Sequence, residues 1–164
     1  MEDSCSEDIP PHSRLSSGCK LCFEGAKLVL FITGLCQRSC WYCPLSAQRK
    51  DTDVIFANEH RVSSPEEMLV VARKMSALGT GITGGEPFLV PERLVAYTKA
   101  LKTTFGSDHQ IHLYSGIAPG RDVLVRVSGL IDEIRLHPPH EEWNSIRDSR
   151  YHLSVKTARA LGFD

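Results

Sequence analysis

Short apolar segments alternate with helical segments along most of the chain, and this alternation limits its fold more than any other feature. Residues 28–32 form a continuous apolar run, which is typical of a strand buried on both faces of a parallel sheet. We expect three more strands, at residues 80–83, 110–115 and 131–137. The segment from the first strand to about Val62 is long and polar, and is expected to be a loop.

Two helices are predicted with clear boundary signals. Ser64 and Glu67 form a capping box around Pro65, a residue that is favoured at the first helical position. Apolar residues follow at helical spacing, and Gly79 is the expected stop. These apolar residues are Met68, Val71, Ala72, Met75 and Leu78. A second helix is expected from Pro91, and its apolar face comprises Leu94, Thr98, Leu101 and Phe105.

Strands that alternate with helices build a parallel sheet that can curl into a barrel. Weaker helical patterns at residues 121–128 and 151–161 continue the alternation. The sequence therefore predicts the α/β class, as an incomplete, partial (βα) barrel of about four βα units. Residues 161–164 resemble a helix end followed by the start of another strand. An open sheet edge is unfavourable, so we expect a C-terminally truncated chain or a fragment of a larger protein.

Composition and charge exclude several classes of function. Lys and Arg number 19 against 20 Asp and Glu, so the chain lacks the basic excess of proteins that bind nucleic acid through its backbone. The longest purely apolar run is far shorter than the ~18–20 residues of a membrane span. The start of the chain is acidic, which is the wrong sign for a secretory signal. We expect a cytoplasmic protein that binds neither nucleic acid nor membrane.

All of the cysteines lie in the first 43 residues. They are Cys5, Cys19, Cys22, Cys36, Cys40 and Cys43. In a chain without an export signal, clustered cysteines are more typical of metal ligands than of disulfides. The last three have the spacing CxxxCxxC on one loop, and three thiolates leave one iron of a cubane iron–sulfur cluster open to another ligand. Cys5 is expected to be a free thiol.

A zinc site is the competing interpretation of the same cysteines. Cys19 and Cys22 form one CxxC pair, Cys40 and Cys43 form another, and 17 residues separate the pairs. This spacing is suitable for a Cys₄ zinc site. It leaves Cys36 without a role. Cys19 and Cys22 could also bind a separate metal or remain reduced thiols.

A second motif, TGGEP at residues 83–87, follows the second predicted strand. Together with the CxxxCxxC loop and Tyr42 before the last cysteine, it resembles the signature of the radical S-adenosylmethionine (radical SAM) superfamily. Residues 19 to about 90 are similar to a group of proteins related to pyruvate formate-lyase activating enzyme. That group has a similar CxxC ahead of the sequence KLVLFITGLC, and has CPLS at the last cysteine.

The resemblance implies an iron–sulfur cofactor and a partial barrel of the radical SAM type. Cys36, Cys40 and Cys43 would ligate three irons of a [4Fe–4S] cluster, and the fourth iron would chelate S-adenosylmethionine through its amino and carboxylate groups. The reduced cluster would cleave S-adenosylmethionine to a 5′-deoxyadenosyl radical for hydrogen abstraction. The electron would come from a small donor such as flavodoxin or ferredoxin. A glycine of a partner protein is the substrate of activating enzymes.

The resemblance also implies which residues would contact S-adenosylmethionine. They are Tyr42, Gly84, Gly85, Glu86 and Ser115. The glycine motif would receive the methionine amino group, because glycines allow a close backbone approach and a carboxylate accepts from an ammonium group. Tyr42 would lie beside the adenine. Ser115, and Arg135 or His137, match the family's cofactor positions loosely.

The predicted organisation has two parts. Residues 1–26 are expected to be a mobile arm with a CxxC extension, and residues 27–164 the N-terminal part of a radical SAM core. No catalytic side chain is assigned. Two alternatives to a radical SAM enzyme stay open, namely a zinc-stabilised binding module and an inactive truncated fragment.

Overall fold

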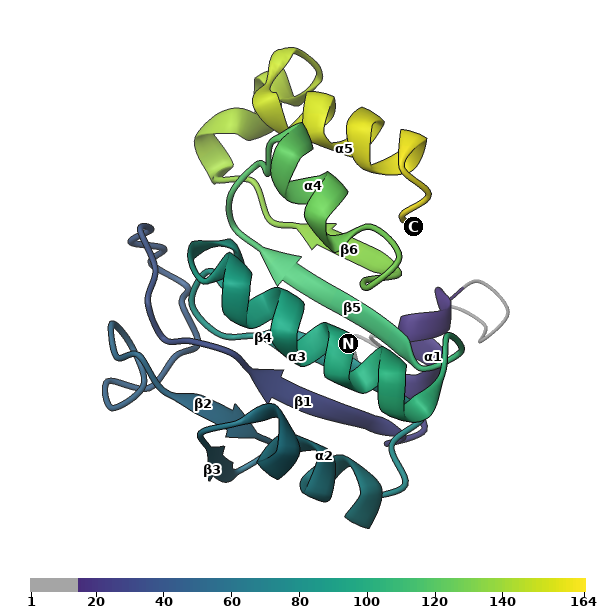
Figure 1. The fold of residues 1–164 in the computed structure, drawn as a ribbon. Helices are drawn as coiled ribbons and strands as arrows, with labels where there is room; N and C mark the ends of the chain where they lie inside the picture. Colours follow the sequence, from purple (N-terminus) through teal and green to yellow (C-terminus); the bar gives the residue numbers. More distant parts are fainter. Residues whose placement is uncertain (1–14) are drawn as a thin grey trace, which may run out of the picture.

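A six-stranded sheet forms the centre of the protein, as seen in a computed structural model that describes residues 15–164 (Figure 1). The strand order is β3-β2-β1-β4-β5-β6. Strands β1 (Lys27–Phe31), β4 (Gly79–Thr83), β5 (Gln110–Ser115) and β6 (Glu133–Leu136) are parallel neighbours. All four match strands expected from the sequence. The α/β class and the partial barrel are confirmed.

The two remaining strands form an antiparallel hairpin that the sequence did not predict. They are β2 (Ile55–Ala57) and β3 (His60–Val62), and β2 pairs with β1. The expectation of a loop as far as Val62 is therefore wrong for this part. Each strand has only three residues, too few to show an alternating pattern. The turn depends on Asn58, whose φ of 52° lies in the left-handed region that asparagine tolerates.

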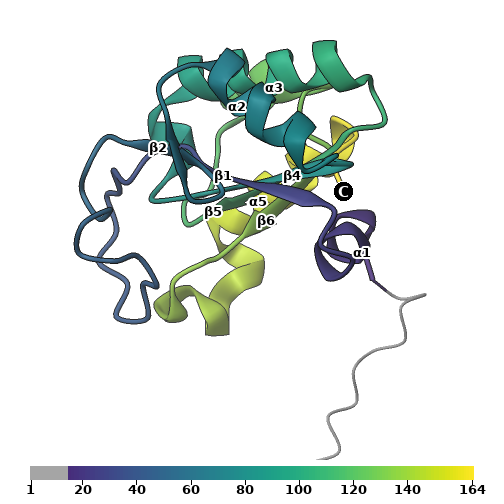
Figure 2. The ribbon, with the colours of Figure 1, turned by 90° about the horizontal axis from the view of Figure 1, so that it is seen from below.

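Helices cover both faces of the sheet (Figure 2). Helices α2 (Pro65–Lys74), α3 (Pro91–Phe105), α4 (Arg121–Val127) and α5 (Arg150–Ala160) pack successively against one another, with α2 and α3 over one face. Helix α1 (Ser17–Phe23) lies on the opposite face. Two short 3₁₀ segments, η2 (Pro87–Leu89) and η3 (His140–Asp148), complete the structure. Within residues 15–164, every helix is too short or too polar to cross a membrane.

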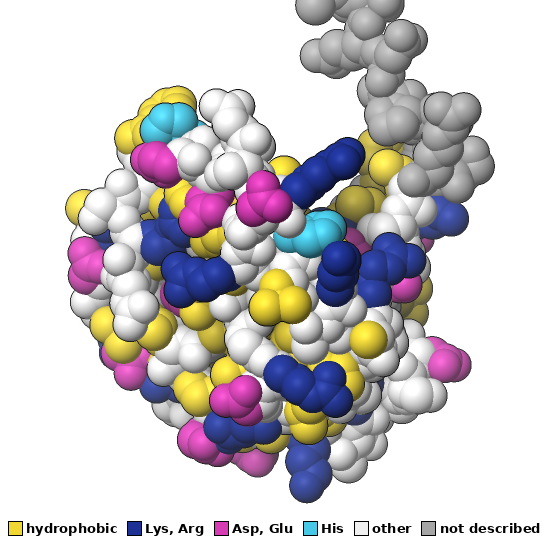
Figure 3. All heavy atoms as spheres, turned by 90° about the horizontal axis from the view of Figure 1, so that it is seen from above, with side chains coloured by type: hydrophobic (Ala, Val, Ile, Leu, Met, Phe, Trp, Pro, Cys, Tyr) yellow, Lys and Arg dark blue, Asp and Glu magenta, His cyan; other side chains and the backbone are white. Residues whose placement is uncertain are grey.

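The core lies between the sheet and helices α2, α3 and α4. Its apolar residues include Leu28, Leu30, Ile82, Ile111 and Leu113 from the strands, and Met68, Ala72, Leu94, Leu101 and Leu124 from the helices. By contrast, the outer surface of α4 and α5 is exposed, and cationic side chains lie there among apolar ones (Figure 3). The α3 face expected from the sequence is the buried one.

The end of helix α2 differs from the prediction. Ser64 accepts from the Glu67 N–H as expected, but the helix ends at Lys74 and the chain turns at Ser76, where φ is 53°. Gly79 is therefore not the helix stop but the first residue of β4. Leu78 lies beyond the helix and is 58 % exposed. Gly79 lies close to β5. A Cβ at this position would lie 2.5 Å from the Gln110 carbonyl oxygen, so glycine allows the two strands to approach.

A polar cluster occupies the sheet face beneath α1. Lys27 donates to Gln110 and lies 2.6 Å from Nδ1 of His112, and both side chains are buried. A side chain at Gly18 of α1 would collide with Glu133 and His112, so α1 packs closely on this cluster. The CxxC of the expected extension thus lies in a helix. Residues 1–14, including Cys5, are outside the described part of the chain.

Tyr97 on α3 provides a test of the packing. Its side chain is 3 % exposed, and its hydroxyl is the one buried polar side-chain atom without a hydrogen-bond partner among residues 15–164. A buried, unsatisfied hydroxyl costs ~1–3 kcal/mol. We therefore expect Tyr97→Phe to raise the free energy of unfolding by ~1 kcal/mol in urea denaturation. A decrease would show that the hydroxyl has a partner, such as a bound water.

Candidate functional site

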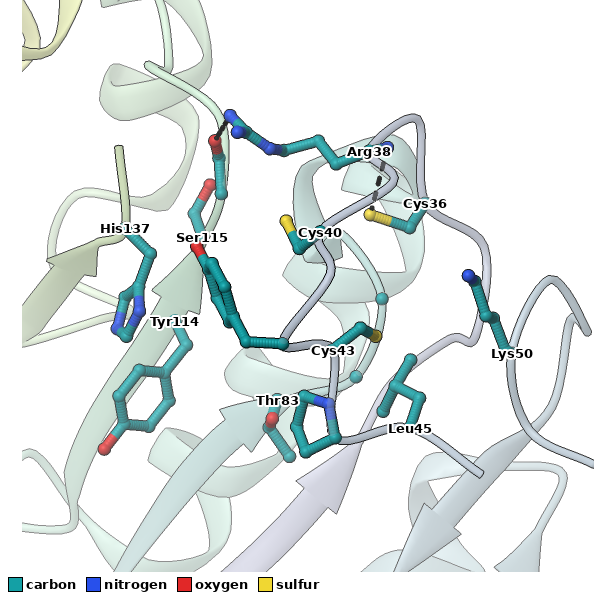
Figure 4. Close-up of a pocket in the computed structure, with 15 residues that line it drawn as sticks. Cys36, Arg38, Cys40, Cys43, Leu45, Lys50, Thr83, Tyr114, Ser115 and His137 are labelled. Atoms are coloured by element: carbon teal, nitrogen blue, oxygen red, sulfur yellow. Dashed lines mark hydrogen bonds between the residues drawn. The ribbon is translucent and has the colours of Figure 1, made fainter. Parts of the chain in front are cut away.

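A cavity of about 280 Å³ lies where the parallel strands end (Figure 4). The cysteine loop after β1, the glycine motif after β4 and the ends of β5 and β6 all contribute to its wall. The lining includes Cys36, Arg38, Cys40, Tyr42, Cys43, Lys50, Thr83, Gly84, Gly85, Tyr114, Ser115 and His137. The fold thus brings together most of the site residues expected from the sequence.

The three loop cysteines share this cavity without forming a closed metal site. Each is partly buried, and the loop consists of bends and turns, one of them closed by the Cys43 N–H donating to the Cys40 carbonyl oxygen at 3.1 Å. Burial raises the pKa of the Cys36 thiol. Within residues 15–164, no three Cys, His, Asp or Glu side chains converge closely enough to hold a metal ion. Ligation by these thiols therefore requires the loop to adjust, as metal sites commonly do on binding.

The glycine motif packs directly against the segment that leads into the cysteine loop. Gly84 has a φ of 134°, and a Cβ there would lie 2.3 Å from the carbonyl oxygen of Thr33. The Gly85 N–H donates to the same oxygen at 2.7 Å, and a Cβ on Gly85 would lie 2.1 Å from the carbonyl oxygen of Leu35. Only glycine fits at either position. The bare backbone of both residues lines the cavity.

Glu86 is fully buried and is not among the residues that line the cavity. It accepts hydrogen bonds from Ser115 Oγ at 2.9 Å, the Gly116 N–H at 2.8 Å and the Phe88 N–H at 3.2 Å. Burial raises the pKa of this carboxyl group, against the opposing effect of the hydrogen bonds that it accepts. In this arrangement Glu86 connects the glycine motif to the end of β5. A contact with the methionine amino group remains a prediction.

Of the other residues predicted to contact S-adenosylmethionine, some line the cavity and one does not. Ser115 lines the cavity while its hydroxyl donates to Glu86. Tyr42 lies at the rim, 45 % exposed, with its ring edge-to-face on Trp41. Of the two alternatives at the end of the β6 segment, His137, which directly follows β6, reaches the cavity. Arg135 instead donates to Glu133 at 2.6 Å and to Cys19 Sγ at 3.1 Å, on the side of the sheet where α1 lies.

The two CxxC pairs lie at opposite ends of the sheet. Cys19 and Cys22 are in α1, which precedes β1, whereas Cys40 and Cys43 follow the carboxyl end of β1 (Figure 1). A Cys₄ zinc site made of both pairs is not formed in this structure. Its ligands would have to come together across the length of the strands.

Several cavity residues were not predicted, among them Arg38, Lys50 and Tyr114. Arg38 stands inside the CxxxCxxC spacing, and its position was the only available signal. Lys50 belongs to the polar loop, and Tyr114 is one residue before Ser115 in β5. These residues line the cavity because of the paths of the loops over the strand ends, and the periodicity of the sequence does not predict those paths.

The fold and the site together define an α/β protein with a three-cysteine loop and a glycine motif at the carboxyl edge of a parallel sheet. The chain is 46 % identical over 127 residues to a protein of Methanocaldococcus jannaschii described as "Putative glycyl-radical enzyme activating enzyme". The match covers 76 % of this chain and 34 % of that protein, so the chain spans about a third of its relative's length. This similarity confirms the resemblance to the radical SAM activating-enzyme group.

Two other comparisons add nothing to this assignment. No protein-family model matches the chain. No solved structure matches it either. The assignment therefore depends on the relative and on the motifs themselves.

Proposed function

We propose that the chain binds a [4Fe–4S] cluster through Cys36, Cys40 and Cys43 and binds S-adenosylmethionine beside it. The observation that carries this proposal is that these three thiols and the bare backbone of Gly84 and Gly85 line one cavity. Three thiols are the ligand set that leaves one iron open. With such a cluster bound, the chemistry supplied is one-electron cleavage of S-adenosylmethionine to a 5′-deoxyadenosyl radical, which abstracts hydrogen.

The chain's own residues would hold and orient the cofactor. The glycines let a ligand approach the backbone at the end of β4. Tyr42 on the cysteine loop and His137 after β6 both line the cavity, and their rings would pack against an adenine. Glu86 keeps the end of β5 in place by accepting from Ser115 and Gly116. These roles use only positions that the structure places at or next to the cavity.

The finer proposal is an activating-enzyme-like reaction. It follows from the description of the M. jannaschii relative, and it implies a small electron donor such as flavodoxin or ferredoxin and a glycine of a partner protein as substrate. Because this chain spans about a third of that relative's length, turnover of a protein substrate is proposed from the relative's description alone.

The test is reconstitution of the purified chain with iron and sulfide in the absence of oxygen. We expect a brown protein with about four irons per chain, and a changed EPR signal when S-adenosylmethionine is added after reduction. A colourless protein with one bound zinc would favour the zinc-stabilised module. A chain that takes up neither metal would favour the inactive fragment.

A further inference from the structure

Arg38 fastens the cysteine loop to two distant parts of the chain. Its Nη1 donates to the carbonyl oxygen of Gly116 at 2.6 Å and to the hydroxyl of Tyr151 at 2.9 Å (Figure 4 shows the first of these bonds). The Tyr151 hydroxyl in turn donates to the same Gly116 oxygen at 2.6 Å. Tyr151 is a buried residue of α5, so the last helix contacts the cysteine loop through this side chain.

The same arginine contacts one of the three proposed iron ligands and shares the cavity with the other two. Its backbone N–H donates to Cys36 Sγ at 3.4 Å. Against the lowering effect of burial, the nearby Cys40 thiol helps to raise the pKa of the Arg38 guanidinium. Hydrogen bonds to ligand sulfurs and nearby positive charge are among the factors that set the reduction potential of an iron–sulfur cluster. Arg38 therefore holds the loop in place through its hydrogen bonds and also places a positive charge near the ligand sulfurs.

Gly116 is the point at which these contacts meet the glycine motif. Its N–H donates to Glu86 at 2.8 Å, and its carbonyl oxygen accepts from Arg38. A Cβ at Gly116 would lie 2.9 Å from Cδ of Arg38, so the arginine stem packs directly on the glycine. The cysteine loop, the TGGEP segment and α5 are thus connected through one residue after β5.

We propose that Arg38 is a positioning residue for the cluster: held by Gly116 and Tyr151, it keeps the cysteine loop at the cavity, so that only a local adjustment brings the thiols to the iron, and its charge raises the reduction potential of the cluster. This inference rests on the proposed function. A positive charge beside the ligands stabilises the reduced, more negative cluster, so loss of the charge shifts the potential to more negative values.

The experiment compares Arg38→Gln, Arg38→Lys and Tyr151→Phe with two matched controls. Arg126→Gln removes an exposed arginine that pairs with Glu92, away from the loop. Tyr97→Phe removes a hydroxyl with no partner among the described residues. Labelling of Cys36 and Cys43 by a maleimide is measured in the iron-free protein. Iron loss to a chelator and the EPR-monitored midpoint potential are measured in the loaded protein.

We expect Tyr151→Phe and Arg38→Gln to speed labelling roughly fivefold, the ratio that loss of a hydrogen bond worth ~1 kcal/mol produces. Both should lose iron faster than the controls. Arg38→Gln should lower the midpoint potential. Arg38→Lys should keep the wild-type potential, because the charge remains, but should still be labelled faster than the wild type. Thermal unfolding separates these effects from general loss of structure, and Tyr151→Phe preserves the ring packing if the arginine variants fail to fold.

Rates and potentials equal to those of the controls would overturn the inference. A wild-type chain that binds no iron would instead overturn the proposed function. In that case the labelling rates still decide whether Arg38 and Tyr151 fix the loop.

Discussion

Cys36→Ala is expected to abolish iron uptake, whereas Cys22→Ala is expected to leave it at the wild-type level. Cys36 lines the cavity at the carboxyl ends of the strands, together with Cys40 and Cys43. Cys22 is exposed on α1, which precedes β1. Loss of one of three protein ligands leaves two thiols, too few to hold a cubane cluster with one open iron. Loss of Cys22 removes no proposed ligand.

The two substitutions form a matched pair because the zinc interpretation predicts the reverse. A site made of Cys19, Cys22, Cys40 and Cys43 would be destroyed by Cys22→Ala and indifferent to Cys36→Ala. Iron, sulfide and zinc per chain are counted after anaerobic reconstitution, with thermal unfolding of each variant as the control for folding. Full iron content in Cys36→Ala would refute the ligand assignment. Loss of metal in Cys22→Ala alone would revive the zinc site.

The sequence was sufficient for the parallel part of the fold, because each element carried its own local signal. The apolar run of β1, the cap at Ser64 and the proline that begins α3 are all local features. The hairpin β2–β3 and the end of α2 were missed for the opposite reason. Three-residue strands show no period, and the turn at Ser76 depends on a left-handed conformation in a residue that does not signal it.

The candidate site was likewise predicted only in part from the sequence. Cys36, Cys40, Cys43 and the two glycines are recognisable from motifs, and the fold brings them to one cavity. The orientation of Glu86 toward Gly116 depends on where the loop after β5 passes, and the contact between Arg38 and Tyr151 joins residues 113 positions apart. No periodicity or short motif contains that information. Long-range hydrogen bonds of this kind become visible only in three dimensions.

Acidification is expected to destabilise the fold through two buried histidines. Burial, together with nearby Lys102 and Lys27, lowers the pKa of His109 to about 4 from the usual 6.5, and burial together with Lys27 lowers the pKa of His112 to about 4. His112 Nδ1 lies 2.6 Å from Lys27 Nζ, so a proton there would place two cations in contact in a buried cluster. His109 Nε2 lies 2.9 Å from Thr80 Oγ1, and its ring stacks on Phe105. Both rings are therefore neutral in the folded protein at pH 7.

The direction of the effect follows from proton linkage. Between pH 6.5 and about 4 the unfolded chain binds these protons and the folded chain does not, so the stability that is complete above pH 6.5 is lost as the pH falls. Each histidine contributes a slope of up to ~1.4 kcal/mol per pH unit in that window. Glu86, whose pKa is raised by burial, gains a proton in the folded state and offsets part of this loss.

Because other groups titrate in the same range, the prediction is made for the difference between variants. His112→Gln keeps a side-chain acceptor for Lys27 but cannot be protonated, so it should reduce the histidine contribution to the slope by about half. His60→Gln alters an exposed histidine at the hairpin and should leave the slope unchanged. Urea denaturation at a series of pH values from 7 to 4.5 measures both. Equal slopes in wild type and His112→Gln would show that this ring is already charged, or solvated, in the folded protein.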